Sequence, residues 1–246
     1  MLRSPFACAL VALLVCVSVP VLAAGPDPAG SAQTPVPVSH GLTWVGFHAG
    51  GLGGFAFEPV TRTSTNTVSN VITDSSFSGN GALGGGRGGY IFRTRTGLVG
   101  FEGDDMAGSI SGQFNSTNAS GATTSTSVSK TKMLGTARGI YAYSFGKALL
   151  TIGAGVAWHS VTTTRTQVLG QVNNAPVGTV EILPVSNAGL ALSADVSKQL
   201  AAHLTFSVGY LYAHFSHTSL TPLSLISSVT STPVHAIVAG VTYFAK

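Results

Sequence analysis

The chain has 246 residues, of which only 8% are charged, and its formal net charge is +4. This charged share is about a third of that in a typical soluble domain. Mean hydropathy is +0.39, yet no segment after the N-terminal region offers the roughly 18 consecutive apolar residues that a membrane helix needs. The scattered positive charges exclude an electrostatic nucleic-acid surface, and low charge with high hydropathy is typical of a membrane β-barrel.

The N-terminal segment, residues 1–24, is predicted to be a secretory signal peptide. A short positive start precedes an apolar stretch and then the small residues "VLAAG", so we expect cleavage after Ala23 or Ala24. Both cysteines, Cys8 and Cys16, lie within this segment. The mature protein is therefore expected to have no disulfide and no thiolate chemistry.

A flexible leader rich in proline, glycine and serine is expected over residues 25–41, and the barrel itself over residues 42–246. In the barrel region, apolar residues alternate with small or polar ones, which predicts half-buried β-strands. The alternating runs are residues 43–57, 81–92, 97–109, 133–143, 148–161, 186–197, 203–215 and 233–244.

The connections between these runs are alternately long and short. The long ones are rich in serine, threonine and asparagine and cover residues 58–80, 110–132, 162–185 and 216–232, whereas the short ones cover residues 93–96, 144–147 and about 198–202. This order predicts an all-β fold, an eight-stranded antiparallel up-and-down transmembrane β-barrel. Its short turns would face the periplasm and its long loops the outside of the cell.

The short connection "RTRT" fixes a predicted register for the second and third runs. As a four-residue turn it would pair Gly88 with Phe101 and Arg87 with Glu102. The aromatic ring of Phe101 would then cover the bare backbone of a glycine. Because Phe101 belongs to the apolar, lipid-facing side, Glu102 must face the lumen.

The connection "SFGK" gives a second, independent register. As a four-residue turn it would pair Tyr143 with Ala148 and Arg138 with Gly153. The apolar faces of the two runs coincide in this arrangement, as they must when one face meets lipid. Arg138 then faces the lumen.

The stretch "GLVGFEGDDMAG" contains an unusual concentration of carboxylates for a chain with eight acidic residues. We interpret Arg87, Glu102, Asp104 and Arg138 as a lumenal charge network with a structural role, because buried charges persist only when they are paired. A pair of catalytic carboxylates and a conduction path for protons or ions are the alternatives. Asp105 falls on the opposite face.

A second set of candidates lies at the outer end of the seventh run, in "AHFSHT". His214, Ser216 and His217 are weak rim candidates, since a histidine near a serine is similar to the pair of outer-membrane lipid A deacylases. No acidic partner for the histidine is evident, and ordinary interfacial residues are the simpler interpretation. The glycines of "GALGGGRGGY" precede a strand turn rather than a helix, which excludes a nucleotide site. No cofactor, metal or catalytic residue is expected.

Several stretches resemble a known family. They are "TWVGFHAGGLGG", "GGGRGGYIFRTRTGLVGFEGD", "LGTARGIYAYSFGKALLTIGAGVAW", "HLTFSVGYLYAHF" and "VAGVTYFAK". In order, they are similar to the strands of the small outer-membrane β-barrels of alphaproteobacteria, the opacity-type, porin-like surface antigens. The likeness covers residues 43–246 and is carried above all by Gly100–Asp104 and Thr136–Gly139. It implies an eight-stranded outer-membrane barrel; family members are structural surface proteins and antigens, and some are adhesins, haem binders or weak porins.

The same resemblance implies an assembly signal in the last run, carried by Gly240, Tyr243 and Phe244, although Ala245 and Lys246 follow the terminal aromatic residue. Family members often carry a glutamate before the tyrosine of the seventh run, where this chain has Gly209. One lumenal charge of the family pattern is therefore absent at that position.

The expected function is that of a non-enzymatic surface protein, integral to the bacterial outer membrane and exported through the periplasm. Four long loops rich in serine and threonine would present its interaction surface. Expected partners are outer-membrane lipids and lipopolysaccharide, the outer-membrane assembly machinery, and a host or surface ligand bound through the loops, but no nucleic acid. A narrow porin or ligand-uptake barrel of the haem type is the alternative, followed by a lipid A-modifying enzyme.

Overall fold

The computed structural model describes residues 44–66, 72–95, 97–117, 123–167, 177–178, 180–221 and 226–245. The predicted signal peptide and leader, residues 1–24 and 25–41, lie outside these residues. Within the part of the chain that is described, no helix is long and apolar enough to cross a membrane.

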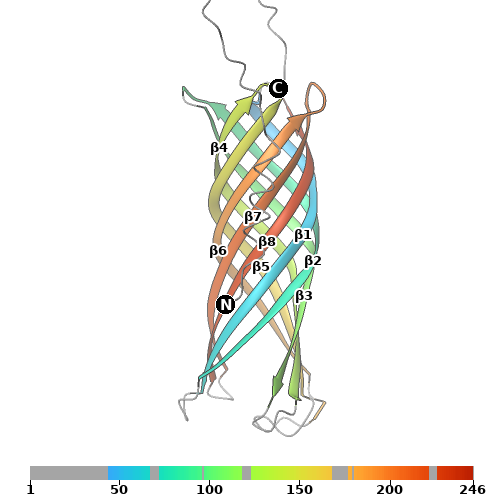
Figure 1. Cartoon of the computed structure of the whole chain (residues 1–246), viewed down its shortest axis with the longest axis vertical. Helices are drawn as coiled ribbons and strands as arrows, with labels where there is room; N and C mark the ends of the chain where they lie inside the picture. The colour runs from blue at the N-terminus through green and yellow to red at the C-terminus, as the bar shows by residue number, and fades with distance from the viewer. Residues whose placement is uncertain are drawn as a thin grey trace, which may run out of the picture. The chain divides into compact units, whose positions relative to one another are not determined.

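Eight strands, each antiparallel to its chain neighbours, form a closed barrel, and β8 pairs with β1 to complete it (Figure 1). The predicted fold class is confirmed. The strands are β1 (Gly46–Asn66), β2 (Ile72–Arg93), β3 (Leu98–Thr117), β4 (Thr123–Phe145), β5 (Ala148–Gln167), β6 (Val180–Gln199), β7 (Leu204–Thr221) and β8 (Ile226–Phe244).

The strands are longer than the alternating runs in the sequence, with 18 to 23 residues each. Much of the sequence expected to form long loops continues the ladders instead: β1 and β2 stay paired as far as Thr65 and Ile72, and β3 and β4 as far as Thr117 and Thr123. Serine and threonine carry no apolar alternation, but threonine readily occupies strands, so the ladder continues after the pattern has faded. The expectation of four long loops was wrong in this respect.

The hairpin between β2 and β3 differs from its predicted register by two residues. The strands end at Arg93 and resume at Leu98, and a backbone hydrogen bond of 2.9 Å from the amide of Thr94 to the carbonyl of Gly97 closes the turn. Phe101 therefore lies opposite Tyr90 rather than Gly88, and Arg87 lies opposite Asp104 rather than Glu102. The turn starts one residue later than the sequence suggested.

The hairpin between β4 and β5 is also displaced by two residues. Phe145 pairs with Ala148, so the turn consists of Gly146 and Lys147 alone, and Arg138 lies opposite Gly155 rather than Gly153. Gly146 has a φ of +65°, which suits the tight turns that join two strands with only two residues. A shift of two residues preserves the side of the sheet on which each residue lies.

The outer surface of the barrel carries a belt of exposed apolar and aromatic side chains. Members of this apolar belt include Phe47, Phe55, Phe92, Phe101, Tyr141, Tyr143, Phe145, Leu150, Ile152, Val156, Trp158, Leu190, Leu192, Phe206, Ile237, Val241 and Tyr243. Alternate residues on the same strands point into the lumen and are buried. The inside and outside of the barrel thus follow the period of two that a β-strand imposes.

Two apolar clusters fill the described lumen at different heights. The terminal-side cluster lies at the end where the chain enters β1 and leaves β8; it comprises Trp44, Ile91, Leu98, Ile140, Ala142, Leu149 and Phe244. The inner cluster lies further along the strands and includes Leu52, Ala56, Leu83, Met106, Ile110, Leu134, Leu211, Phe215 and Val238. On β1 to β4, charged or polar inward residues fall between the two clusters. The lumen therefore contains a polar layer between two apolar ones.

Candidate functional site

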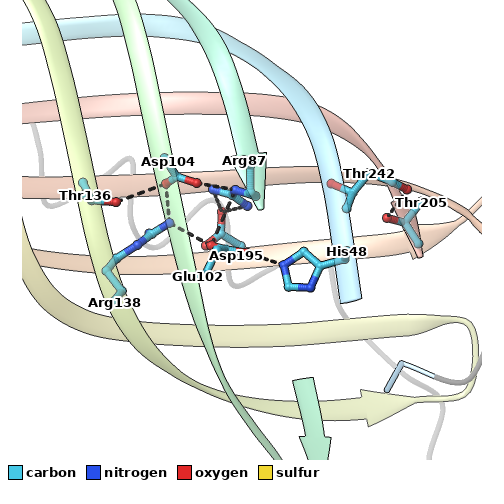
Figure 2. Close-up of polar contacts among 9 residues, drawn as sticks. All are labelled: His48, Arg87, Glu102, Asp104, Thr136, Arg138, Asp195, Thr205 and Thr242. Atoms are coloured by element: carbon cyan, nitrogen blue, oxygen red, sulfur yellow. Dashed lines mark hydrogen bonds and ion pairs between the residues drawn. The ribbon is translucent and has the colours of Figure 1, made fainter. Parts of the chain in front are cut away.

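Six charged or titratable residues meet in the polar layer and form what we call the lumenal charge cluster (Figure 2). Five strands contribute to it, because each strand has one or two inward positions at this height. The members are His48 from β1, Arg87 from β2, Glu102 and Asp104 from β3, Arg138 from β4 and Asp195 from β6. The structure thus brings together all four residues of the predicted network and adds two more.

Arg138 joins the two carboxylates of β3. Its Nη2 donates a hydrogen bond of 2.8 Å to Glu102 Oε1 and a second one to Asp104 Oδ2. Thr136 Oγ1 donates to the same Asp104 oxygen at 3.3 Å. The side chain of Arg138 is completely buried, so these charge-assisted hydrogen bonds form without competition from bulk water.

Arg87 extends the cluster across the lumen. Its Nε donates to Asp104 Oδ1 at 2.8 Å and lies 3.5 Å from Glu102 Oε1. Its two Nη atoms each lie 3.4 Å from Asp195 Oδ1 on β6. Arg87 therefore links the charges of β3 to the opposite part of the sheet, as Figure 2 shows.

His48 connects the charge cluster to the terminal-side cluster. Its Nε2 lies 3.2 Å from Glu102 Oε2, and its ring stacks on that of Phe244 with the centroids 5.2 Å apart. Sequence reasoning missed both His48 and Asp195. The alternation that placed Glu102 and Asp104 in the lumen applies to them as well, and it could have found them.

Gly209 explains how a carboxylate from β6 fits at this height. It pairs with Asp195 in the β6–β7 ladder, and a Cβ atom built on it would lie 1.9 Å from Asp195 Oδ1. The absence of a side chain at Gly209 gives the Asp195 carboxylate its space. The lumenal charge that the family resemblance places on the seventh strand is thus supplied by the neighbouring strand.

A polar cavity adjoins the charge cluster on the side of the terminal-side cluster. His48, Arg87, Glu102 and Asp195 form its charged wall, and Phe244 contributes to its apolar wall. The remaining polar lining consists of hydroxyl groups from Thr151, Ser197, Thr205, Ser207 and Thr242. It has room for a water molecule and enough polar partners to hold one.

This arrangement does not suit acid–base catalysis by Glu102 and Asp104. Both carboxylates accept hydrogen bonds from Arg138, both are less than 10% exposed, and apolar clusters lie above and below them. The adjoining cavity, which Glu102 lines, has room for little more than a water molecule, so it does not suit a sugar or peptide substrate. Asp105 is exposed on the outer face, as expected from the alternation.

The rim candidates lie on the outer wall of β7. His214 is half-buried and pairs with Pro233 of β8, whereas Ser216 is exposed. His214 Nδ1 is buried and has no hydrogen-bond partner among the described residues. The side chain of His217 lies outside the described residues. Among the described residues, no carboxylate is hydrogen-bonded to His214 to orient it as a base towards Ser216.

The predicted assembly residues lie near the end of β8 on two different faces. Tyr243 is exposed in the apolar belt, whereas Phe244 is 5% exposed and points into the lumen, where its ring meets that of Trp44 edge-on at 5.7 Å. Gly240 faces Gly51 and Leu52 of β1 closely. The outward terminal aromatic residue is therefore Tyr243, and Phe244 belongs to the terminal-side cluster.

Fold and site together define a closed antiparallel barrel with an apolar exterior and a filled lumen. No protein-family model matches the chain, and no curated protein matches its sequence.

Solved outer-membrane proteins are similar in structure. The outer-membrane protein OprG from Pseudomonas aeruginosa is 16% identical over 84% of this chain and 99% of its own, with a TM-score of 0.47. The outer-membrane protease OmpT from Escherichia coli is 7% identical over 81% and 97%, with a TM-score of 0.49. Neisserial surface protein A is 12% identical over 78% and 97%, with a TM-score of 0.38. At these identities the likeness concerns the fold alone.

Proposed function

We propose that this protein is a non-enzymatic, integral outer-membrane β-barrel of a Gram-negative bacterium, exported through the periplasm, which supports the cell envelope and presents its loops at the surface. The observation that carries this proposal is the apolar belt, in which rings such as Phe101 and Phe55 are more than half exposed. A soluble monomer rarely exposes such a continuous apolar surface. In a bilayer the same surface contacts lipid, and closure of the sheet leaves no unpaired strand edge at that depth.

Fractionation of cell envelopes tests the location directly. We expect the protein in the outer-membrane fraction, with a band that migrates faster on gels when the sample is not boiled and with a β-rich circular dichroism spectrum in detergent. Recovery in the soluble fraction without detergent, or a helical spectrum, would falsify the proposal.

We further propose membership of the opacity-type family of small outer-membrane barrels. The two most similar sequence modules are ladder partners in β3 and β4: Glu102 pairs with Arg138, Phe101 with Gly139. The resemblance therefore covers two segments that contact each other and share a charge pair. Lipopolysaccharide, the assembly machinery and a surface ligand bound through the loops are the partners that this membership implies.

The filled lumen supports a structural role over that of a pore. Leu134 and Met106 of the inner cluster are at most 1% exposed, and Trp44 and Phe244 are buried on the other side of the charge cluster. We expect no steady open level when the purified barrel is inserted in planar lipid bilayers. A stable single-channel conductance would instead support the narrow-porin alternative.

A further inference from the structure

The lumenal charge cluster is not neutral when its histidine is uncharged. Arg87 and Arg138 face the carboxylates of Glu102, Asp104 and Asp195, so that one negative charge is in excess. All five side chains are at most 8% exposed. An uncompensated charge in such an environment is unfavourable, so with His48 uncharged the cluster requires a further positive group.

Among the three carboxylates, Asp195 is the one with an oxygen atom that lacks a partner. Its Oδ1 faces Arg87, whereas its Oδ2 is buried without any hydrogen-bond partner among the described residues. The residue is 3% exposed and lines the polar cavity. One carboxylate oxygen is therefore available to a ligand inside the barrel.

Hydroxyl groups surround Asp195 in the sheet. Thr151 is its ladder partner on β5, and Ser193 and Ser197 are its inward neighbours on β6. Ser207 pairs with Ser197 from β7. Thr151, Ser197 and Ser207 line the same cavity, and Ser193 Oγ is buried without a hydrogen-bond partner in the described part of the chain.

We propose that this cavity binds a monovalent inorganic cation, Na⁺ or K⁺, through the Asp195 carboxylate and the hydroxyl oxygens beside it. Carboxylate, hydroxyl and water oxygens are the ligands that hard cations prefer. A single positive charge balances the single negative charge in excess, whereas a divalent ion would leave the cluster positive. The bound cation would also satisfy the free Oδ2 atom.

The test compares unfolding of the full chain in detergent micelles at one fixed pH. Unfolding half-lives are measured at one elevated temperature in NaCl, KCl or choline chloride of equal ionic strength. We expect the half-life of the wild type to be at least threefold longer in Na⁺ or K⁺ than in choline, and the Asp195→Asn variant to show no such ratio. Asp105→Asn, which removes an exposed carboxylate on the outer face, is the matched control and keeps the ratio.

A second variant keeps the test decisive if Asp195→Asn does not fold. Thr151→Val removes the hydroxyl opposite Asp195 but no charge, and we expect it to lower the ratio towards one. In the wild type, ²³Na resonance broadening that KCl reverses would report binding directly. Equal half-lives in all three salts, or the same ratio in Asp105→Asn, Thr151→Val and Asp195→Asn, would show that the cavity holds only water. These outcomes are independent of the protein's cellular location.

Discussion

The Asp195 carboxylate fills the lumenal space that a side chain at position 209 would need. One of the two positions can therefore carry a carboxylate, but not both. A Cβ atom on Gly209 would lie 1.9 Å from Asp195 Oδ1, and Gly209→Ala must displace the group that faces Arg87. We expect Gly209→Ala to lower the free energy of unfolding by about 1–3 kcal/mol, the usual effect of overpacking. Urea unfolding in detergent, followed by tryptophan fluorescence, measures it.

A transfer of the carboxylate between strands is the control for this prediction. Asp195→Gly removes a charge and Gly209→Glu adds one beside it, so each single variant should be destabilised. The double variant restores the charge count, and it should be more stable than either single variant. Additive losses would show that Asp195 does not compete for the space over Gly209.

Arg138 is the residue whose loss should cost the most. Its buried guanidinium is the partner of both Glu102 and Asp104, and Arg138→Met leaves two carboxylates without their main cation. We expect a loss of about 3–5 kcal/mol in the free energy of unfolding, since one partner of a buried ion pair is removed. Arg93→Met, at an exposed position, should change it by less than about 0.5 kcal/mol. Partial recovery by Glu102→Gln in the Arg138→Met background would identify the uncompensated charge as the cause.

The predicted site was incomplete for a physical reason. Glu102 follows the lipid-facing Phe101 and Asp104 is the next inward residue, whereas Arg87 and Arg138 were placed by their predicted hairpins. Asp195 and His48 follow the same alternation, His48 directly after the lipid-facing Phe47, so the period of two alone places both in the lumen. Their partnership with the arginines depends on contacts across the lumen, which no local pattern encodes.

At the scale of elements, the turn between β4 and β5 depends on Gly146. Its φ of +65° is unfavourable for most side chains, while the space around its Cβ position is open. We expect Gly146→Val to lower the free energy of unfolding by about 1–2 kcal/mol through backbone strain alone. Gly146→Asn should cost clearly less, because asparagine adopts this conformation more readily. An equal loss in both variants would point to a side-chain clash rather than to the backbone, and urea titrations distinguish the two.

The hairpins also show which features of a strand are encoded locally. Both predicted registers were wrong by two residues, because the β4–β5 turn has two residues rather than four and the four-residue β2–β3 turn begins one residue later, yet every inward and outward assignment derived from them was correct. A side chain's face follows from a strict period of two. The parts of the strands that extend into the expected long loops were missed because their hydroxyl-rich sequence has no apolar period. Only pairing across the sheet defines these parts as strands.

At the scale of the whole barrel, the strands extend beyond the apolar belt, and substitutions along one strand can locate the membrane. On β5 the outward residues Leu150, Ile152 and Trp158 lie in the belt. Further along the strand, towards the end of the barrel far from the chain termini, the outward residues are Thr162 and Thr164. A lysine on the lipid face costs about 2–4 kcal/mol at the middle of the bilayer and nearly nothing at its surface. We therefore expect Ile152→Lys to lower the free energy of unfolding in lipid vesicles by that amount and to reduce the folded yield. Thr164→Lys should leave both quantities unchanged. In short-chain detergent micelles, whose shape adapts to the protein, the free energies of unfolding of the two variants should differ less. Equal effects of the two lysines in vesicles would mean that the belt does not mark the bilayer, and the membrane position proposed for the barrel would have to be abandoned.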